Sequence, residues 1–357
     1  METSGGTAMI KSLWLCGVVM LGCPGWAQTE EFRVGALYWS MNIPGQVAMR
    51  SGLEHERAAI NREAASTGAA TVVLESRVAG DGEAGIENQI QQMRELIAAG
   101  VDLLIVQPTD NAALAAPLRQ ANAAGIPVIA YDQYISGGQL AAYRTSDNYQ
   151  AGYLDGEYIA SRFANDQEIQ LVMVEYPHVS STVERVNGFL DALKQAGQMY
   201  RILQTYQAVE PVSGRKAGAD ILRDFPAKRS IDVVFTVNDG GGLAVVEALA
   251  AAGRSEIQVA TIDGDPQSVE NIRAGRLTVI DSAQYCGPLG AEAMRAGYAV
   301  LQNQNPPFHA LVPVFPITRE TVENYSGWSG PVADPFTKPW ESLDPEWRGE
   351  LKVLPAK

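Results

Sequence analysis

The sequence predicts an α/β protein with two doubly wound, Rossmann-like lobes. Short apolar runs typical of buried strands alternate with segments of helical apolar spacing, and the alternation occurs in two successive series that divide near residue 169. The chain has 357 residues, which is too long for one small core. We therefore expect two similar lobes, each with a sheet between layers of helices.

One strand, helix, strand unit illustrates how each lobe is built. Residues 103–106 and 128–130 are apolar runs, and the alanines and leucines between them fall at helical spacing until Gly125. A right-handed crossover makes two such strands parallel neighbours in one sheet. Ligands of such sheets collect outside the carboxyl ends of the strands, where Gln107 and Asp132 stand in this sequence.

The other elements follow the same alternation. Further strands are expected at residues 34–37, 71–75, 142–146, 169–174, 201–205, 233–237, 257–262 and 277–282. Further helices are expected at residues 46–66, 86–99, 150–163, 182–196, 213–225, 243–252, 268–274 and 287–301. Residues 306–357 are rich in proline, contain three tryptophans and lack a sustained period, so we expect an ordered extension that wraps one lobe.

The first 27 residues have the pattern of a signal peptide. Lys11 precedes an apolar run at residues 13–21 that is too short to span a membrane, and small residues lead up to Ala27. We expect cleavage after Ala27 and an exported mature protein. In the competing interpretation, a lipoprotein, the lipid would be attached to Cys23.

Composition excludes several classes of function. After cleavage only Cys286 remains, so no internal disulfide can form. The formal net charge of -14 argues against binding to nucleic acid or to an anionic membrane surface. With 46% hydrophobic and 19% charged residues, the chain is globular. As a separate expectation, the protein is a monomer.

The sequence carries no pattern of an enzyme. His55, His178 and His309 fall in different predicted elements and lack metal-ligand spacing. Neither a phosphate-binding loop nor a dinucleotide fingerprint occurs, and Cys286 has no neighbouring histidine in the sequence. We therefore expect no catalysis, no cofactor and no metal.

Several short motifs stand at the ends of predicted strands or the starts of predicted helices, and each alone is ordinary turn chemistry. They are Ile-Pro-Val-Ile at 126–129 followed by Asp132, Ser146-Asp147-Asn148, Glu184-Arg185 with Gly188-Phe189, residues 235–239, Asp263-Gly264 and Ala283-Gln284. In this order the motifs resemble the type I periplasmic binding proteins, specifically their ribose-like sugar-binding branch, over residues 32–318.

The resemblance implies two lobes joined by a hinge that the chain crosses three times, closing on a small molecule. It places the crossings near residues 143–146, near Asn238 and near Gln284. The expected amino-terminal lobe comprises residues 32–142 and 285–312, and the carboxyl-terminal lobe comprises residues 143–284 and 313–357.

Two aspartates are the first candidates for ligand binding. Asp132 and Asp263 end corresponding strands of the two lobes, so the resemblance places them on facing walls of the cleft. A carboxylate can accept two hydrogen bonds from vicinal hydroxyls, and charged hydrogen bonds contribute about 1.5–3 kcal/mol. The alternative is that each aspartate only caps the following loop.

Polar side chains at other strand ends are further candidates. Asn238 and Gln284 match positions that hold ligand amides in the resembled branch, and an amide both donates and accepts. Their alternative role is to stabilise the hinge. Ser146 could instead cap the next helix, and Gln107 could instead order its own loop.

The chain also departs from the pattern of the branch. Its first loop offers Trp39 and Asn42, and the Trp39 ring could stack on a sugar or belong to the core. Gln133 stands where an arginine is expected after the aspartate. A second arginine, expected two residues before Arg185, is replaced by Val183. Tyr176 could fill the space of these two missing cations. These departures put ribose itself in doubt.

We expect a periplasmic solute-binding protein that delivers a neutral sugar or polyol to an inner-membrane ABC permease. The alternative is a sensory binding protein that presents a small ligand to a chemoreceptor or sensor kinase. A sugar-responsive repressor of the same fold is disfavoured, because a signal sequence occupies the place of a DNA-binding helix pair.

Overall fold

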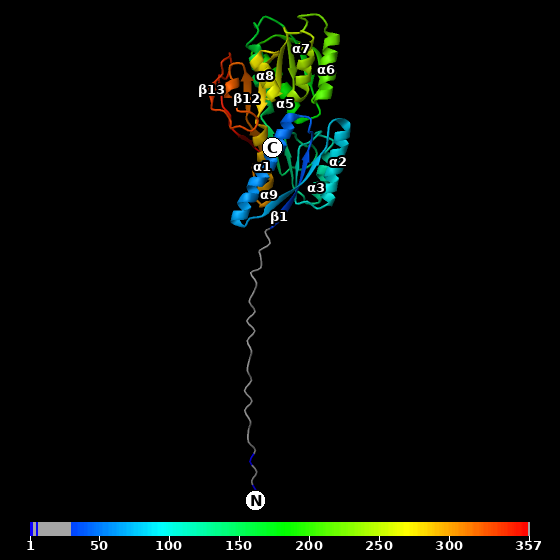
Figure 1. The fold of residues 1–357 in the computed structure, drawn as a ribbon, viewed down its shortest axis with the longest axis vertical. Helices are drawn as coiled ribbons and strands as arrows, with labels where there is room; N and C mark the ends of the chain where they lie inside the picture. Colours follow the sequence, from blue (N-terminus) through cyan, green and yellow to red (C-terminus); the bar gives the residue numbers. More distant parts are fainter. Residues whose placement is uncertain (3–4, 6–29, 356–357) are drawn as a thin grey trace.

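The computed structural model describes residues 1–2, 5 and 30–355. The apolar part of the predicted signal peptide, the cleavage site after Ala27 and the alternative lipid site at Cys23 lie outside the described residues. Two α/β lobes lie one above the other along the long axis of the molecule (Figure 1). In the part described, none of the helices has the length and apolar character needed to cross a membrane.

The first lobe contains a seven-stranded sheet with the order β15-β11-β5-β4-β3-β1-β2, parallel except for the edge strand β15. Its strands are β1 (Glu31–Tyr38), β2 (Thr71–Val78), β3 (Leu103–Val106), β4 (Val128–Tyr131), β5 (Ala142–Ser146), β11 (His309–Val312) and β15 (Lys352–Leu354). Its helices are α1 (Pro44–Thr67), α2 (Gly82–Ala98), α3 (Ala115–Ala123) and α9 (Cys286–Leu301). The pair α1 and α9 covers one face, and α2 and α3 cover the other.

The second lobe contains a six-stranded sheet with the order β12-β10-β9-β8-β6-β7, parallel except for β12. Its strands are β6 (Ile169–Glu175), β7 (Tyr200–Gln207), β8 (Val233–Thr236), β9 (Gln258–Asp263), β10 (Thr278–Gln284) and β12 (Val314–Thr318). Its helices are α4 (Asn148–Ala160), α5 (Ser180–Gln195), α6 (Pro211–Asp224), α7 (Asp239–Ala251) and α8 (Pro266–Ala274). The observed architecture confirms the predicted fold class.

A close helix contact in the second lobe depends on glycine. A Cβ atom at Gly152 of α4 would lie 1.9 Å from the backbone oxygen of Arg185 in α5. At Gly188 a Cβ atom would lie 2.0 Å from the backbone oxygen of Tyr149. Because no side chain fits between them, α4 and α5 pack backbone to backbone, and this contact fixes the position of Arg185.

The chain passes between the two sheets after β5, after β10 and between β11 and β12. The first two passages are near residue 146 and Gln284, as expected. The expected crossing near Asn238 is wrong, because that residue joins β8 to α7 within the second lobe. The third passage is instead at Pro313, where no local motif marks it. The residue limits given above for the two lobes stay a prediction.

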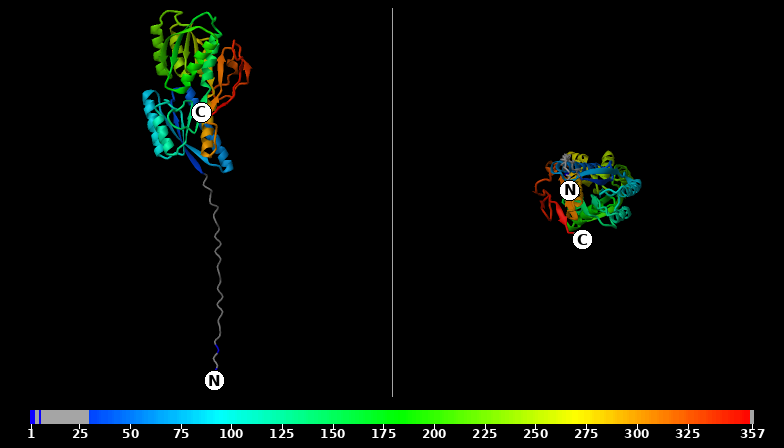
Figure 2. Two further views of the ribbon diagram at one scale, coloured as in Figure 1. Left: turned by 180° about the vertical axis from the view of Figure 1, so that it is seen from behind. Right: turned by 90° about the horizontal axis from the view of Figure 1, so that it is seen from below.

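Residues 319–355, here called the tail, follow β12 and run along one side of the molecule (Figure 2). They contain the short helix η1 (Val322–Asn324), the hairpin of β13 (Phe336–Thr337) and β14 (Glu346–Trp347), and β15. The rings of Phe336 and Trp347 pack on Phe315 of β12 in the second lobe. Since β15 pairs with β11 in the first sheet, the expectation that the tail wraps only one lobe is wrong.

Candidate functional site

A small cavity lies between the two lobes at the carboxyl ends of their strands. Its volume is about 20 Å³, room for about one water molecule. Six of the residues predicted for the site line it, namely Trp39, Asp132, Gln133, Asn238, Asp263 and Gln284. Because the cavity is so small, a ligand larger than water can enter only when the lobes move apart.

Asp132 follows β4 and is 2% exposed. Its Oδ2 accepts a hydrogen bond of 3.0 Å from Nε2 of Gln107, and its buried Oδ1 has no hydrogen-bond partner among the described residues. The backbone around it is fixed by a bond of 2.8 Å from its amide to the oxygen of Arg144. A buried polar atom without a partner costs about 1–3 kcal/mol, so a donor from a ligand at Oδ1 would remove that cost.

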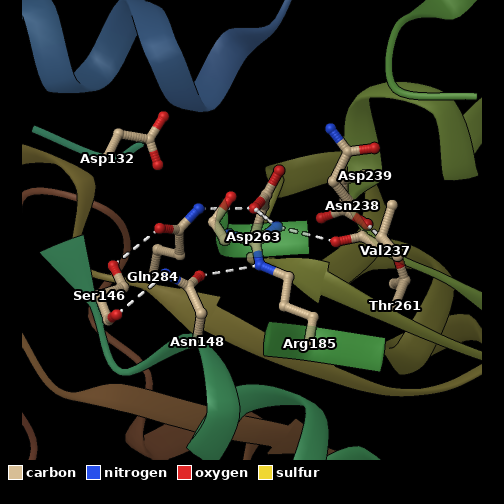
Figure 3. A network of polar contacts seen from close by, with 12 residues as sticks. Asp132, Ser146, Asn148, Arg185, Val237, Asn238, Asp239, Thr261, Asp263 and Gln284 are labelled. Atoms are coloured by element: carbon tan, nitrogen blue, oxygen red, sulfur yellow. Dashed lines mark hydrogen bonds and ion pairs between the residues drawn. The ribbon is translucent and has the colours of Figure 1, made fainter. Parts of the chain in front are cut away.

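Asp263 ends β9 and is the centre of a buried polar network (Figure 3). Its Oδ1 accepts hydrogen bonds from Nη1 of Arg185 at 3.0 Å and from Nε2 of Gln284 at 2.7 Å. Gln284 in turn accepts a bond of 2.7 Å from the hydroxyl of Ser146. The network thus connects the end of β5 in the first lobe with α5 in the second lobe, through the hinge.

Both aspartates have backbone conformations that side-chain-bearing residues rarely adopt. The φ angle is 65° at Asp132 and 135° at Asp263. Such conformations cost on the order of 1–3 kcal/mol each and persist where the surrounding structure imposes them, often at functional sites. The same strain at two facing strand ends favours a binding role over simple loop capping for both residues.

Burial raises the pKa of several carboxyl groups here. The pKa of Asp132 rises to about 6, because burial outweighs the opposing effects of the Arg185 charge and the Gln107 hydrogen bond. Burial also raises the pKa of Asp263, against the opposing charge of Arg185. Behind Asp263, burial raises the pKa values of Asp239 and Asp281 as well. In the part of the chain that the structure describes, Arg185 supplies the one guanidinium group that lines the cavity.

The predicted amides have different surroundings. Asn238 lines the cavity but also caps α7, because its Oδ1 accepts from the amide of Gly241 and its Nδ2 donates to Val209. Gln107 does not line the cavity and supports Asp132 from behind. Ser146 likewise lies one step behind the cavity wall, bonded to Gln284.

One wall of the cavity is apolar. Trp39 is 3% exposed and packs with Val179 and Val209 of the second lobe. Tyr176 supports this wall from outside the cavity, with its ring centre 6.2 Å from that of Trp39. Asn42 is exposed, does not line the cavity and donates to Asp81 at 2.7 Å.

The two lobes are also joined by direct hydrogen bonds at the start of α5. The backbone amide of Ser180 donates to Oδ1 of Asn111 at 3.2 Å, and that of Ser181 donates to Oε1 of Gln133 at 3.3 Å. The hydroxyl of Ser180 accepts from the amide of Tyr134 at 2.9 Å. First-lobe side chains thus satisfy free amides of a second-lobe helix, and these bonds hold the two lobes together in this structure.

Nine described residues of the cavity wall are absent from the predicted set, and three of them, Arg185, Gln46 and Met49, have long side chains. Arg185 was part of a motif but was not assigned to the site, and Gln46 and Met49 lie in the first turns of α1. The Glu-Arg pair was a signal for Arg185, whereas nothing in the local pattern distinguished Gln46 and Met49. Among the described residues, no cluster of histidine, cysteine or acidic side chains is suited to hold a metal ion.

Comparison with known proteins identifies relatives. A family model described as the periplasmic binding protein domain matches residues 45–305 and ends before the tail. The ribose import binding protein of Bacillus subtilis is 26% identical over 301 residues, 82% of this chain and 92% of that protein. The ribose import binding protein of Escherichia coli K12 is 26% identical over 74% of this chain and 83% of its own length.

Solved structures share the fold. A solute binding protein from Actinobacillus succinogenes with bound D-allose superposes with a TM-score of 0.68 at 23% identity, over 82% of this chain and 100% of that one. A solute binding protein from Bacillus halodurans with bound myo-inositol gives a TM-score of 0.71 at 21% identity, over 83% of this chain and 98% of that one.

Proposed function

The chain belongs to the periplasmic binding protein family, specifically its ribose-like branch, and on that premise we propose that it captures a neutral sugar or polyol in the periplasm. The main support for the proposal is that Asp132 and Asp263, which come from opposite lobes, line the same cavity, and that this cavity has an apolar wall. Two buried carboxylates can accept hydrogen bonds from several hydroxyls, and the Trp39 wall suits the C–H face of a ring. The reported relatives are binding proteins by name, which agrees with the expectation that the chain is not an enzyme.

Binding would proceed through movement of the lobes. An open form admits the ligand, and closure restores the bonds from Ser180 and Ser181 to the first lobe. A ligand hydroxyl at Oδ1 of Asp132 would supply the donor that the carboxylate lacks. Because these contacts exist only in the closed form, the ligand would shift the population toward it.

We further propose that the closed form delivers its ligand to an ABC permease as a monomer. The names of the Bacillus and Escherichia relatives, which describe import, support this partner over a chemoreceptor or sensor kinase. Uptake of the bound sugar into membrane vesicles that carry the cognate permease would support import. Uptake that is independent of the protein would contradict it.

A thermal-shift screen tests the ligand class. The panel contains D-ribose, D-allose, myo-inositol, L-arabinose, amino acids and small amines. A compound at about one hundred times its Kd should add about 2.7 kcal/mol to the free energy of unfolding. Asp132→Asn should abolish the shift, whereas Asp166→Asn, at an exposed turn, should retain it. A shift with an amino acid or amine but with no carbohydrate would overturn the sugar assignment.

A further inference from the structure

The tail contacts the candidate binding site from behind. Nε1 of Trp328 donates a hydrogen bond of 2.7 Å to the backbone oxygen of Asp263. This carbonyl belongs to the residue whose φ angle is 135° and whose carboxylate lines the cavity. A strained conformation persists only where the surroundings impose it, and the Trp328 bond is one of the contacts that do so here.

Trp328 also contacts the first lobe. Its backbone oxygen accepts a hydrogen bond of 3.0 Å from the amide of Gly287, in the first turn of α9. Its ring lies beside Gly45 of α1, where an added Cβ atom would be 3.9 Å from it. Gly45 is itself part of the cavity wall. One tail residue therefore bonds the second-lobe wall of the site and lies beside the first-lobe wall.

The tail is fastened to the second lobe downstream of Trp328. The buried carboxylate of Glu157 in α4 accepts hydrogen bonds from Lys338 at 2.8 Å, Trp340 at 3.0 Å and Ser342 at 2.5 Å. Lys338 and Glu157 are both nearly inaccessible to solvent. Because this ion pair is buried and both partners are hydrogen-bonded, the attachment is firm.

The end of the tail is fastened to the first lobe. β15 pairs antiparallel with β11, at the edge of the first sheet. Nζ of Lys352 lies 2.6 Å from Oδ2 of Asp147, immediately after the passage from β5 to α4. The tail therefore spans from β12 in the second lobe to β11 in the first, in addition to the three hinge passages.

We propose that the tail is a strap across the hinge and that Trp328 is its positioning residue, holding the backbone of Asp263 in the binding conformation and stabilising the closed lobes. The role of Asp263 in this inference rests on the proposed function. The restraint on lobe movement does not, because it follows from the contacts of the tail with both lobes. Removing the indole N–H should therefore loosen the unliganded protein as well as weaken binding.

The test uses the full chain with two matched substitutions. Trp328→Phe removes the bond to Asp263, and Trp340→Phe removes a tail bond to Glu157 that is remote from the cavity. Without ligand, Trp328→Phe should increase the radius of gyration in small-angle X-ray scattering and accelerate hydrogen exchange at the Gly287 amide. Trp340→Phe should do neither, because Lys338 and Ser342 still hold the tail to Glu157. If Trp328→Phe has the same radius of gyration as the wild-type protein and the same exchange rate at the Gly287 amide, the strap proposal is overturned.

A second arm measures binding of D-ribose, D-allose and myo-inositol by titration calorimetry and stopped flow. Because Trp328→Phe loses one hydrogen bond, we expect its affinity for the carbohydrate to be about three- to tenfold weaker, mainly through faster release of the carbohydrate. Equal affinities for both variants would overturn the positioning role. If no carbohydrate binds the wild-type protein, the proposed function fails, and the ligand-free arm still decides whether the strap exists.

Discussion

Asn111 of the first lobe and Ser180 of the second are joined by a hydrogen bond of 3.2 Å, from the Ser180 amide to Oδ1 of Asn111. Ser180 begins α5, where backbone amides lack partners within the helix. The bond therefore exists only when the lobes are closed. Asn111→Ala should destabilise the closed form and weaken ligand affinity about three- to tenfold, as measured by titration calorimetry. Affinity equal to that of the wild-type protein would contradict this role.

Ligand affinity should depend on pH through Asp132. Burial raises the pKa of this carboxyl group to about 6, and hydrogen bonds from ligand hydroxyls favour its ionised form. Affinity should be constant above about pH 7 and should fall as the pH decreases below 6. Titrations between pH 5 and 8 measure this dependence. A bound sugar whose affinity increases toward pH 5 would contradict an ionised Asp132 in the complex.

Removal of Arg185 should destabilise the protein strongly. Its guanidinium is buried and bonds Asp263, Asn148 and the backbone of Val237. Arg185→Met leaves the Asp263 carboxylate buried without its cation, which should cost about 3–5 kcal/mol in urea unfolding. Adding Asp263→Asn should recover part of this loss, since the unpaired charge is then gone. A loss below about 1 kcal/mol would show that the pair contributes little.

The buried carboxyl groups behind the cavity should make the protein less stable at high pH. Burial raises the pKa of Asp281, so the folded state binds more protons than the unfolded state above about pH 4. The contribution of the Asp281 carboxyl group to stability is therefore present at low pH, and it is lost as the pH rises through the pKa of this group in the folded state. Asp281→Asn, which keeps an acceptor for the Gly264 amide, should raise the Tm at pH 8 more than at pH 5. An equal change of Tm at pH 5 and pH 8 would contradict a raised pKa of Asp281.

The strand ends could be predicted from the sequence because they follow continuous apolar runs. β3 and β4 are fully buried along their length, and Gln107 and Asp132 follow them directly. The rule that parallel strands end at one edge of a sheet then brings these residues together. The same rule predicted the place of Asp263 at the end of β9. Whether these side chains bind a ligand is a separate question that the strand pattern does not decide.

Other features depend on contacts between distant parts of the chain. Arg185 reaches Asp263 because α4 and α5 touch at Gly152, which no local pattern reveals. Asn42 was a candidate because it lies in the first loop, yet it faces Asp81. The tail joins both lobes through the pairing of β15 with β11, and a short strand at the end of the chain gives no signal of its partner.

The most direct measurement for the central claim is a crystal structure with the carbohydrate that gives the largest thermal shift. We expect the sugar or polyol to lie between the lobes, with hydroxyls within hydrogen-bond distance of Oδ1 of Asp132 and of the Asp263 carboxylate, and with a ring face against Trp39. A carbohydrate bound elsewhere, or bound in the cleft without contact to either aspartate, would contradict it.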